Sequence, residues 1–177
     1  MIKEYKNFLT KEQHESLFKY IQNEDFPWYH VQDEYKDSTL NYTKFSHILY
    51  HSNTIRSEHW EQFIPLFNTL NIQMYHRIKL NLTLKEEEEI MLGSYHHDYM
   101  GNVNANDYSV TAPLKELKIA IYYFNETNGE TLIKENGKIK KIKCEENKLV
   151  TFSNTLEHVG MSHTDTQFRY ILNINYI

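Results

Sequence analysis

Two potential metal ligands stand close together near the middle of the chain. His96 and Asp98 are separated by one residue, and side chains two residues apart on an extended strand project from the same face. His158 follows 60 residues after Asp98 and is the candidate for a third ligand. Two imidazoles and one carboxylate that leave coordination positions open suit non-haem Fe(II). The pattern therefore predicts an iron site formed by His96, Asp98 and His158.

A cation follows the last of these ligands. Arg169 lies 11 residues after His158, at the start of the strand-like run 169–177. The residues that share its face on an alternating strand are Ile171, Asn173 and Asn175. This face points into the fold if Leu172 and Ile174, on the opposite face, pack against helices. The planar guanidinium can bind a carboxylate through two parallel hydrogen bonds.

The order of these residues resembles that of the Fe(II)/2-oxoglutarate-dependent dioxygenases, and the flanking sequence is most similar to their prolyl-hydroxylase branch. Three blocks carry the resemblance: IAIYYFN at 119–125 with Gly129 soon after, NKLVTFS at 147–153, and the strand of Arg169. The match covers roughly residues 75–177, and the chain is also similar to small phage-encoded members of this group. The resemblance implies Fe(II) as the metal, 2-oxoglutarate as the co-substrate and O2 as the oxidant.

The resemblance also implies roles for individual side chains. Arg169 is expected to bind the distal carboxylate of 2-oxoglutarate, and Tyr123 occupies the position of a phenol that hydrogen-bonds the same group in prolyl-hydroxylase-like enzymes. Asn81 stands on the strand before the metal motif, where the related alkylation-repair demethylases have an asparagine that contacts 2-oxoglutarate. Thr131 and Asn175 are expected to line the same pocket. For Tyr123 and Asn81 a purely structural role in the core remains open.

Other histidines compete for the metal. His97 directly adjoins His96 and therefore points to the opposite face of a strand. His163 is an alternative distal ligand, but it stands in a polar loop, whereas His158 follows a predicted strand at the distance typical of the family. Two more histidines in a strand-like run are interpreted as structural: His47 and His51.

Three functions are compatible with this pattern. The leading hypothesis is an oxygenase that hydroxylates a C–H bond while 2-oxoglutarate is decarboxylated to succinate, with a peptidyl prolyl or other amino-acid side chain as the first candidate substrate. A demethylase or hydroxylase of nucleic-acid bases is disfavoured, because the chain has Asn175 rather than a second arginine six residues after Arg169. A non-catalytic, cupin-like metal-binding or sensing module is disfavoured because it does not need Arg169.

Composition limits the remaining possibilities. A chain of 177 residues with 40% hydrophobic residues fits one domain with a single core. The formal charge of -5 makes nucleic acid an unlikely partner and favours small or peptide-like substrates. One cysteine, Cys144, excludes an internal disulfide and a cysteine-based zinc site. Without an apolar segment of signal-peptide or membrane-spanning length, the sequence predicts a cytoplasmic protein, of a cell or of an infected host.

The elements that must position these residues are helices followed by strands. A capping-box pattern at Thr10 predicts a helix over 10–23, and Ser57 predicts the cap of a second helix that Pro65 kinks or splits. Period-2 alternation over 77–83 predicts a strand with one buried face. Further expected strands are 45–50, 117–124, 130–133, 138–143, 148–152 and 168–176, with a hairpin at Asn136-Gly137.

These elements favour an α+β domain whose core is a double-stranded β-helix, or jelly roll, with supporting N-terminal helices. Residues 1–177 form one domain in this interpretation, with a helical part over about 1–72 and the jelly-roll core over about 75–177. Two segments without a clear pattern, 32–43 and 100–113, are predicted loops that select the substrate, the first as a lid. The acidic run 86–89 is predicted to be a solvated turn.

Overall fold

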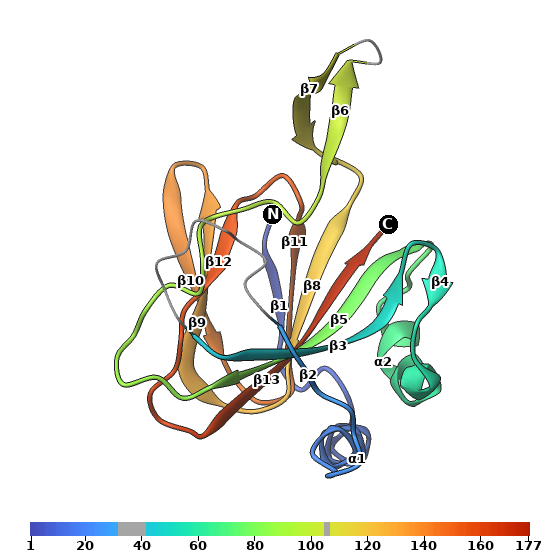
Figure 1. The fold of residues 1–177 in the computed structure, drawn as a ribbon, viewed down its shortest axis with the longest axis vertical. Helices are drawn as coiled ribbons and strands as arrows, with labels where there is room; N and C mark the ends of the chain where they lie inside the picture. Colours follow the sequence, from blue (N-terminus) through green and yellow to red (C-terminus); the bar gives the residue numbers. More distant parts are fainter. Residues whose placement is uncertain (32–41, 105–106) are drawn as a thin grey trace.

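The computed structural model describes residues 1–31, 42–104 and 107–177, with side chains outside 102–110. Its main sheet is antiparallel, in the order β1-β11-β8-β13-β5-β3-β2 with β4 paired to β3 (Figure 1). The bounds are β1 Lys3–Tyr5, β2 Tyr29–His30, β3 Lys44–His51, β4 Thr54–Ile55, β5 Tyr75–Leu84, β8 Lys118–Tyr123, β11 Lys148–Ser153 and β13 Phe168–Tyr176. The first 72 residues thus supply strands as well as helices.

A smaller sheet faces the main one. It has the order β10-β9-β12, with β9 at Thr127–Glu135, β10 at Lys138–Cys144 and β12 at His158–Gly160. Between β9 and β10, Asn136 and Gly137 have φ values of 53° and 73°, which confirms the predicted hairpin turn. Side chains of both sheets form one buried cluster, which includes Ile121 of β8 and Ile133 of β9. Two facing antiparallel sheets confirm the predicted jelly roll.

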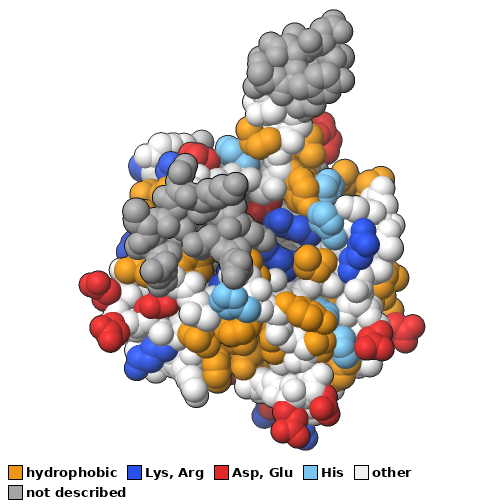
Figure 2. Space-filling model, viewed as in Figure 1, with side chains coloured by type: hydrophobic (Ala, Val, Ile, Leu, Met, Phe, Trp, Pro, Cys, Tyr) orange, Lys and Arg blue, Asp and Glu red, His pale blue; other side chains and the backbone are white. Residues whose placement is uncertain are grey.

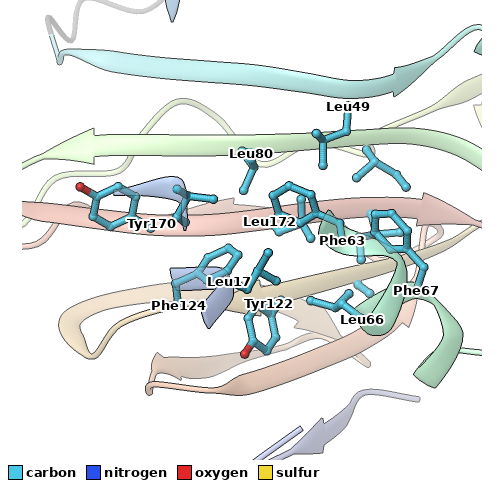
Figure 3. Close-up of a cluster of buried hydrophobic side chains, with 14 of the residues drawn as sticks. Leu17, Leu49, Phe63, Leu66, Phe67, Leu80, Tyr122, Phe124, Tyr170 and Leu172 are labelled. Carbon is cyan, nitrogen blue, oxygen red and sulfur yellow. The ribbon is translucent and has the colours of Figure 1, made fainter. Parts of the chain in front are cut away.

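The helices cover the other face of the main sheet. Helix α1 (Lys11–Ile21) begins with the predicted capping box, in which Thr10 and Gln13 exchange hydrogen bonds. The second predicted helix is divided at Pro65, as expected, into a 3-10 helix η1 (Glu58–Phe63) capped by Ser57 and a short helix α2 (Ile64–Thr69). Both helical regions pack on the sheet in Figure 3, where Leu17 of α1 and Leu66 of α2 belong to the same buried cluster as Leu172 of β13.

The core under the helices fixes the direction of β13. Leu172 and Ile174 are fully buried in this core, together with Leu80 of β5. Full burial of one such side chain contributes about 1.5 to 3 kcal/mol to stability. Because successive side chains alternate between faces, Arg169 and Asn175 must point toward the smaller sheet. The prediction for this strand is confirmed.

Strand β5 departs from its prediction. The sequence predicts one buried face, but both faces are buried: Lys79, Asn81 and Thr83 are only 5%, 3% and 8% exposed. The helices cover the apolar face, and the smaller sheet encloses the polar one. Strand alternation indicates which residues share a face but not whether a second layer covers it.

Two further segments differ from expectation. Residues 94–98 are not a regular strand, since only His96 forms an isolated bridge there. The predicted loop 100–113 is a two-stranded ribbon, β6 (Met100–Asn104) and β7 (Asp107–Pro113), which projects from the body of the molecule (Figure 1). The predicted lid 32–43 lies, except for its last two residues, outside the described residues.

Among the helices of the described residues, none has the length and apolarity to cross a membrane.

Candidate metal centre

Three side chains converge between the two sheets. The ligand atoms of His96, Asp98 and His158 all lie within 4.8 Å of one another. Asp98 Oδ1 is 3.6 Å from His96 Nε2 and 3.8 Å from His158 Nε2. Two reciprocal backbone hydrogen bonds, of 3.1 and 3.0 Å, join His96 to His158 and hold the two imidazoles side by side. The backbone therefore brings together the three residues predicted as ligands.

Hydrogen bonds of the imidazoles indicate which nitrogen faces the centre. His96 Nδ1 donates to the carbonyl of Ser94 at 2.9 Å, so Nε2 is the nitrogen that faces Asp98 and is available to a metal. His97 instead donates from Nδ1 to the carbonyl of Asn154 at 2.9 Å. His97 stays outside the cluster, as the sequence predicts.

The carboxylate of Asp98 is held from behind. Asn175 Nδ2 donates to Asp98 Oδ2 at 2.6 Å, and Arg77 Nη2 lies 3.4 Å from Oδ1. Arg77 Nε also donates to Asn175 Oδ1 at 3.2 Å, which closes a network of three residues. Burial raises the pKa of Asp98, but the hydrogen bond with His96 and the charges of His158 and Arg77 outweigh it and hold this pKa well below its usual range. Asp98 is therefore ionised at neutral pH.

The two imidazoles differ in their electrostatic environment. Burial lowers the pKa of His158 to about 4, although the charge of Asp98 opposes the shift. Burial also acts to lower the pKa of His96, but the hydrogen bond with Asp98 outweighs it and raises this pKa above its usual value. A neutral His158 offers its lone pair without losing a proton. Two imidazoles and one ionised carboxylate on one side of a cavity fit a divalent transition metal such as Fe(II).

The cavity beside this cluster contains the predicted arginine. It is lined by Tyr42, Lys44, Arg77, Lys79, Asn81, Thr83, Leu92, His96, Asp98, Ile121, Thr131, His158, Gly160, Arg169, Ile171 and Asn173. Arg169 is 3% exposed, and its Nη1 donates to the carbonyl of Met161 at 2.8 Å. Its Nε and Nη2 have no hydrogen-bond partner among the described residues, and neither has Asn81 Oδ1. Buried guanidinium donors without partners fit an anionic ligand.

The other predicted pocket residues lie around Arg169. The hydroxyl of Tyr123 donates to Thr131 Oγ1 at 2.8 Å, and the guanidinium carbon of Arg169 is 5.8 Å from the ring centre of Tyr123. Burial raises the pKa of Tyr123, so its phenol stays neutral and can act as a hydrogen-bond donor. Thr131 and Asn81 line the cavity directly, whereas Asn175 lies behind Asp98.

A glycine allows the close approach of these groups. A Cβ atom at Gly129 of β9 would lie 3.1 Å from Arg169 Nη1, 3.1 Å from the carbonyl oxygen of Ser162 and 3.2 Å from His163 Cβ. These distances are tighter than ordinary van der Waals contact. Glycine therefore gives the Arg169 guanidinium its room beside β9.

Sequence reasoning missed some residues of this site. Arg77 and Lys79 line the cavity, and Arg77 contacts the Asp98 carboxylate. The signal was present, because both residues share a strand face with Asn81, which the sequence assigned to the pocket. His163, placed in a polar loop by the sequence, is fully buried, and neither ring nitrogen has a hydrogen-bond partner among the described residues.

This chain matches known proteins in its three-dimensional structure but not in its sequence. No protein-family model matches the chain, and no curated protein sequence matches it. Solved structures do match. A prolyl hydroxylase from Trichoplax adhaerens, in complex with a hypoxia inducible factor peptide fragment, has a TM-score of 0.67 at 11% identity and covers 99% of this chain and 83% of its own.

Two further solved structures match over nearly the whole chain. A prolyl-4-hydroxylase from Pseudomonas putida has a TM-score of 0.63 at 13% identity, with 99% of this chain and 91% of that chain covered. The viral collagen prolyl hydroxylase of Paramecium Bursaria Chlorella virus-1, in its 2-oxoglutarate complex, has a TM-score of 0.59 at 11% identity, with 99% and 96% covered. This chain therefore has the double-stranded β-helix fold of the Fe(II)/2-oxoglutarate oxygenases, together with a His-Asp-His cluster.

Proposed function

We propose that this protein is an Fe(II)- and 2-oxoglutarate-dependent oxygenase that hydroxylates a C–H bond. The observation that carries the proposal is one cavity that contains both the cluster of His96, Asp98 and His158 and the buried guanidinium of Arg169, two nitrogens of which have no hydrogen-bond partner among the described residues. A metal site alone does not require a buried cation, and a co-substrate with a carboxylate at each end does. For this reason the cupin-like binding module is the weaker proposal.

Each residue has a distinct role in this proposal. His96, Asp98 and His158 hold the metal, and bound Fe(II) supplies the activation of O2. Asn175 and Arg77 keep the Asp98 carboxylate in one orientation through their hydrogen bond and ion pair. Arg169 binds the distal carboxylate of 2-oxoglutarate through Nε and Nη2, for which the described part of the chain offers no acceptor.

Other side chains shape the cavity around the co-substrate. Tyr123, Thr131 and Asn81 surround the Arg169 end and offer a hydroxyl or amide for hydrogen bonding. Ile121 and Ile171 line the same cavity with apolar surface. These apolar walls exclude water and so strengthen the charge pairing inside the cavity.

For the prime substrate, the proposal names chemical classes rather than one compound. A peptidyl prolyl or other amino-acid side chain is the first candidate, supported by the fold shared with prolyl hydroxylases. A nucleic-acid base is the second candidate. In the sequence, the asparagine at position 175 in place of an arginine argues against a base as substrate. The structure removes this argument, because Arg77 of the neighbouring strand places a guanidinium beside Asn175. The formal charge of -5 still disfavours it. A cytoplasmic location stays a prediction from the sequence.

The test is formation of succinate from 2-oxoglutarate with added Fe(II) and O2. We expect turnover in the parent protein and in His97→Ala, which leaves the cluster intact, and none in His96→Ala or His158→Ala. Calorimetry of 2-oxoglutarate binding to the metal-loaded protein gives a second readout, since some oxygenases turn over slowly without their prime substrate. A parent protein that neither binds 2-oxoglutarate nor forms succinate contradicts the proposal.

A further inference from the structure

A positive charge lies directly beside the predicted metal ligand Asp98. Asp98 presents one oxygen, Oδ1, to both imidazoles of the cluster, and Arg77 Nη2 lies 3.4 Å from the same oxygen. This distance is longer than that of an ordinary N–H···O hydrogen bond. Arg77 therefore acts on Oδ1 mainly through its charge and leaves the lone pairs of this oxygen to a metal.

Three contacts hold the guanidinium of Arg77 in this position. Its Nε donates to Asn175 Oδ1 at 3.2 Å, its Nη2 faces Asp98, and its central carbon lies 5.3 Å from the ring centre of Tyr99. Tyr99 packs in turn against His76, with ring centres 3.9 Å apart. Because a long arginine side chain is otherwise free to rotate, these contacts are what fix its charge in one place.

The backbone of β5 is adapted to this arrangement. The register between β5 and β13 shifts just beyond the pair of Arg77 and Asn175, so that His76 has no counterpart on β13. An extra residue of this kind forms a β-bulge, which redirects nearby side chains and is common beside active sites. Here it brings His76 to the ring of Tyr99, while Arg77 keeps its place in the cavity lining.

Little water screens the charge of Arg77 from the cluster. The side chains of Arg77 and Asp98 are 21% and 5% exposed, and Asp98 is the only carboxylate in the described lining of the cavity. On the face shown in Figure 2, Lys and Arg side chains lie in a hollow bordered by histidine and hydrophobic side chains. Charges in such a hollow interact through a lower effective dielectric constant than charges on an open surface.

A bound metal changes what this ion pair does. Without a metal, Arg77 and Asp98 neutralise each other. A divalent metal at the cluster is only partly neutralised by the single carboxylate, so Arg77 adds a further positive charge beside a site that is already positive. A trivalent ion is repelled more strongly, because it adds another unit of charge at the same place. The arrangement therefore favours the lower oxidation state of a metal.

We infer that Arg77 holds the iron of the proposed site in its ferrous state, through a fixed positive charge beside Asp98 Oδ1. The inference rests on the proposed function for the identity of the metal. It gives Arg77 a role in addition to the orientation of Asp98: the iron resists oxidation to Fe(III) and stays competent for turnover. Arg77 acts on the metal through Asp98 and through its charge, and not as a ligand.

The experiment measures the reduction potential of the iron-loaded full chain under argon, with mediator dyes and with EPR detection of Fe(III). Arg77→Met removes the charge and keeps an unbranched side chain. We expect the affinity for Fe(III) to rise about tenfold or more relative to that for Fe(II), which lowers the potential by about 59 mV or more. Arg77→Lys keeps the charge and should retain most of the potential of the parent protein.

Matched variants separate the effect of charge from that of orientation. Asn175→Ala loosens the Asp98 carboxylate without a change of charge, so it should move the potential much less than Arg77→Met does. Arg56→Met makes the same substitution at an exposed arginine, which donates to the carbonyl of His51, and should leave the potential unchanged. Arg77→Gln takes the place of Arg77→Met if methionine disturbs the fold.

The remaining outcomes are distinct. A potential that stays at the parent value in Arg77→Met and Arg77→Gln overturns the inference. An equal fall in Arg77→Lys or Asn175→Ala assigns the effect to the geometry of Asp98, and an equal fall in Arg56→Met assigns it to net charge; either result also overturns it. In all these cases, iron and 2-oxoglutarate binding by the parent leave the proposed function standing. A parent protein that binds no iron contradicts the proposed function and the inference together.

Discussion

The two ends of the cavity are built differently. At the metal end, both oxygens of Asp98 have protein partners, Asn175 and Arg77 among them, and Arg77 is in turn bound to Asn175. At the other end, Arg169 keeps two buried nitrogens without a partner among the described residues, and Thr83 Oγ1 and Asn81 Oδ1 nearby are likewise unpartnered. The Asp98 carboxylate is thus oriented by protein groups, whereas the polar atoms at the Arg169 end offer hydrogen bonds to the 2-oxoglutarate of the proposed function.

This contrast predicts that substitutions at the two ends separate metal binding from co-substrate binding. The largest effect is expected for Asp98→Ala, because it removes the only carboxylate of the cluster and leaves Arg77 and Asn175 without their acceptor. Metal binding, measured by calorimetry, and succinate formation should both fall to background. His97→Ala is the control, since this ring faces away and should keep both activities.

Substitution at the other end should spare the metal. Arg169→Ala is expected to weaken 2-oxoglutarate binding by about 2 to 5 kcal/mol, the usual cost of removing one partner of a buried charge pair. Calorimetry of the metal-loaded protein measures the change. Arg169→Lys should restore part of the affinity, because the ammonium keeps the charge and loses the planar fork. An Arg169→Ala variant that binds 2-oxoglutarate like the parent contradicts the assigned role and removes the main argument against a cupin-like module.

A smaller effect is expected behind the metal ligand. Asn175→Ala removes the 2.6 Å hydrogen bond to Asp98 and the acceptor of Arg77 Nε. Loss of such a supporting hydrogen bond typically lowers metal affinity by about 10- to 100-fold. Metal titration measures the change, and Asn173→Ala, two residues away on the same strand face and outside this network, is the matched control. Equal metal affinities for the two variants contradict the idea of a carboxylate oriented from behind.

The smallest effect is expected at the glycine beside Arg169. Gly129→Ala places a methyl group 3.1 Å from Arg169 Nη1, so the guanidinium must shift slightly. We expect 2-oxoglutarate affinity to fall several-fold, by about 1 kcal/mol, with unchanged metal affinity. Gly137→Ala, in an open turn at positive φ, tests whether any loss reflects stability alone, because it strains the backbone away from the site. A metal affinity that falls as much as the co-substrate affinity contradicts the separation of the two ends.

Much of the site follows from local sequence patterns. The spacing of two residues predicted that His96 and Asp98 point the same way. This holds although their segment is an extended loop rather than a strand. Alternation along β13 placed Arg169 on the inner face, because Leu172 and Ile174 supply the apolar face that the helices cover. Both signals are short-range consequences of backbone geometry and need no knowledge of neighbouring strands.

Other features depend on pairings between distant segments. Arg77 reaches Asp98 only because β5 and β13 pair in a register that sets Arg77 opposite Asn175, 98 residues away in sequence. Lys79 is buried only because the smaller sheet covers a face that strand alternation would equally allow to be solvated. The sequence by itself predicted the three residues of the His-Asp-His cluster, the buried arginine of the same cavity and the jelly-roll class. Only the tertiary structure decided that Arg77 reaches Asp98 and that the polar face of β5 is covered, because cross-strand register and layer packing are long-range properties that no local pattern encodes.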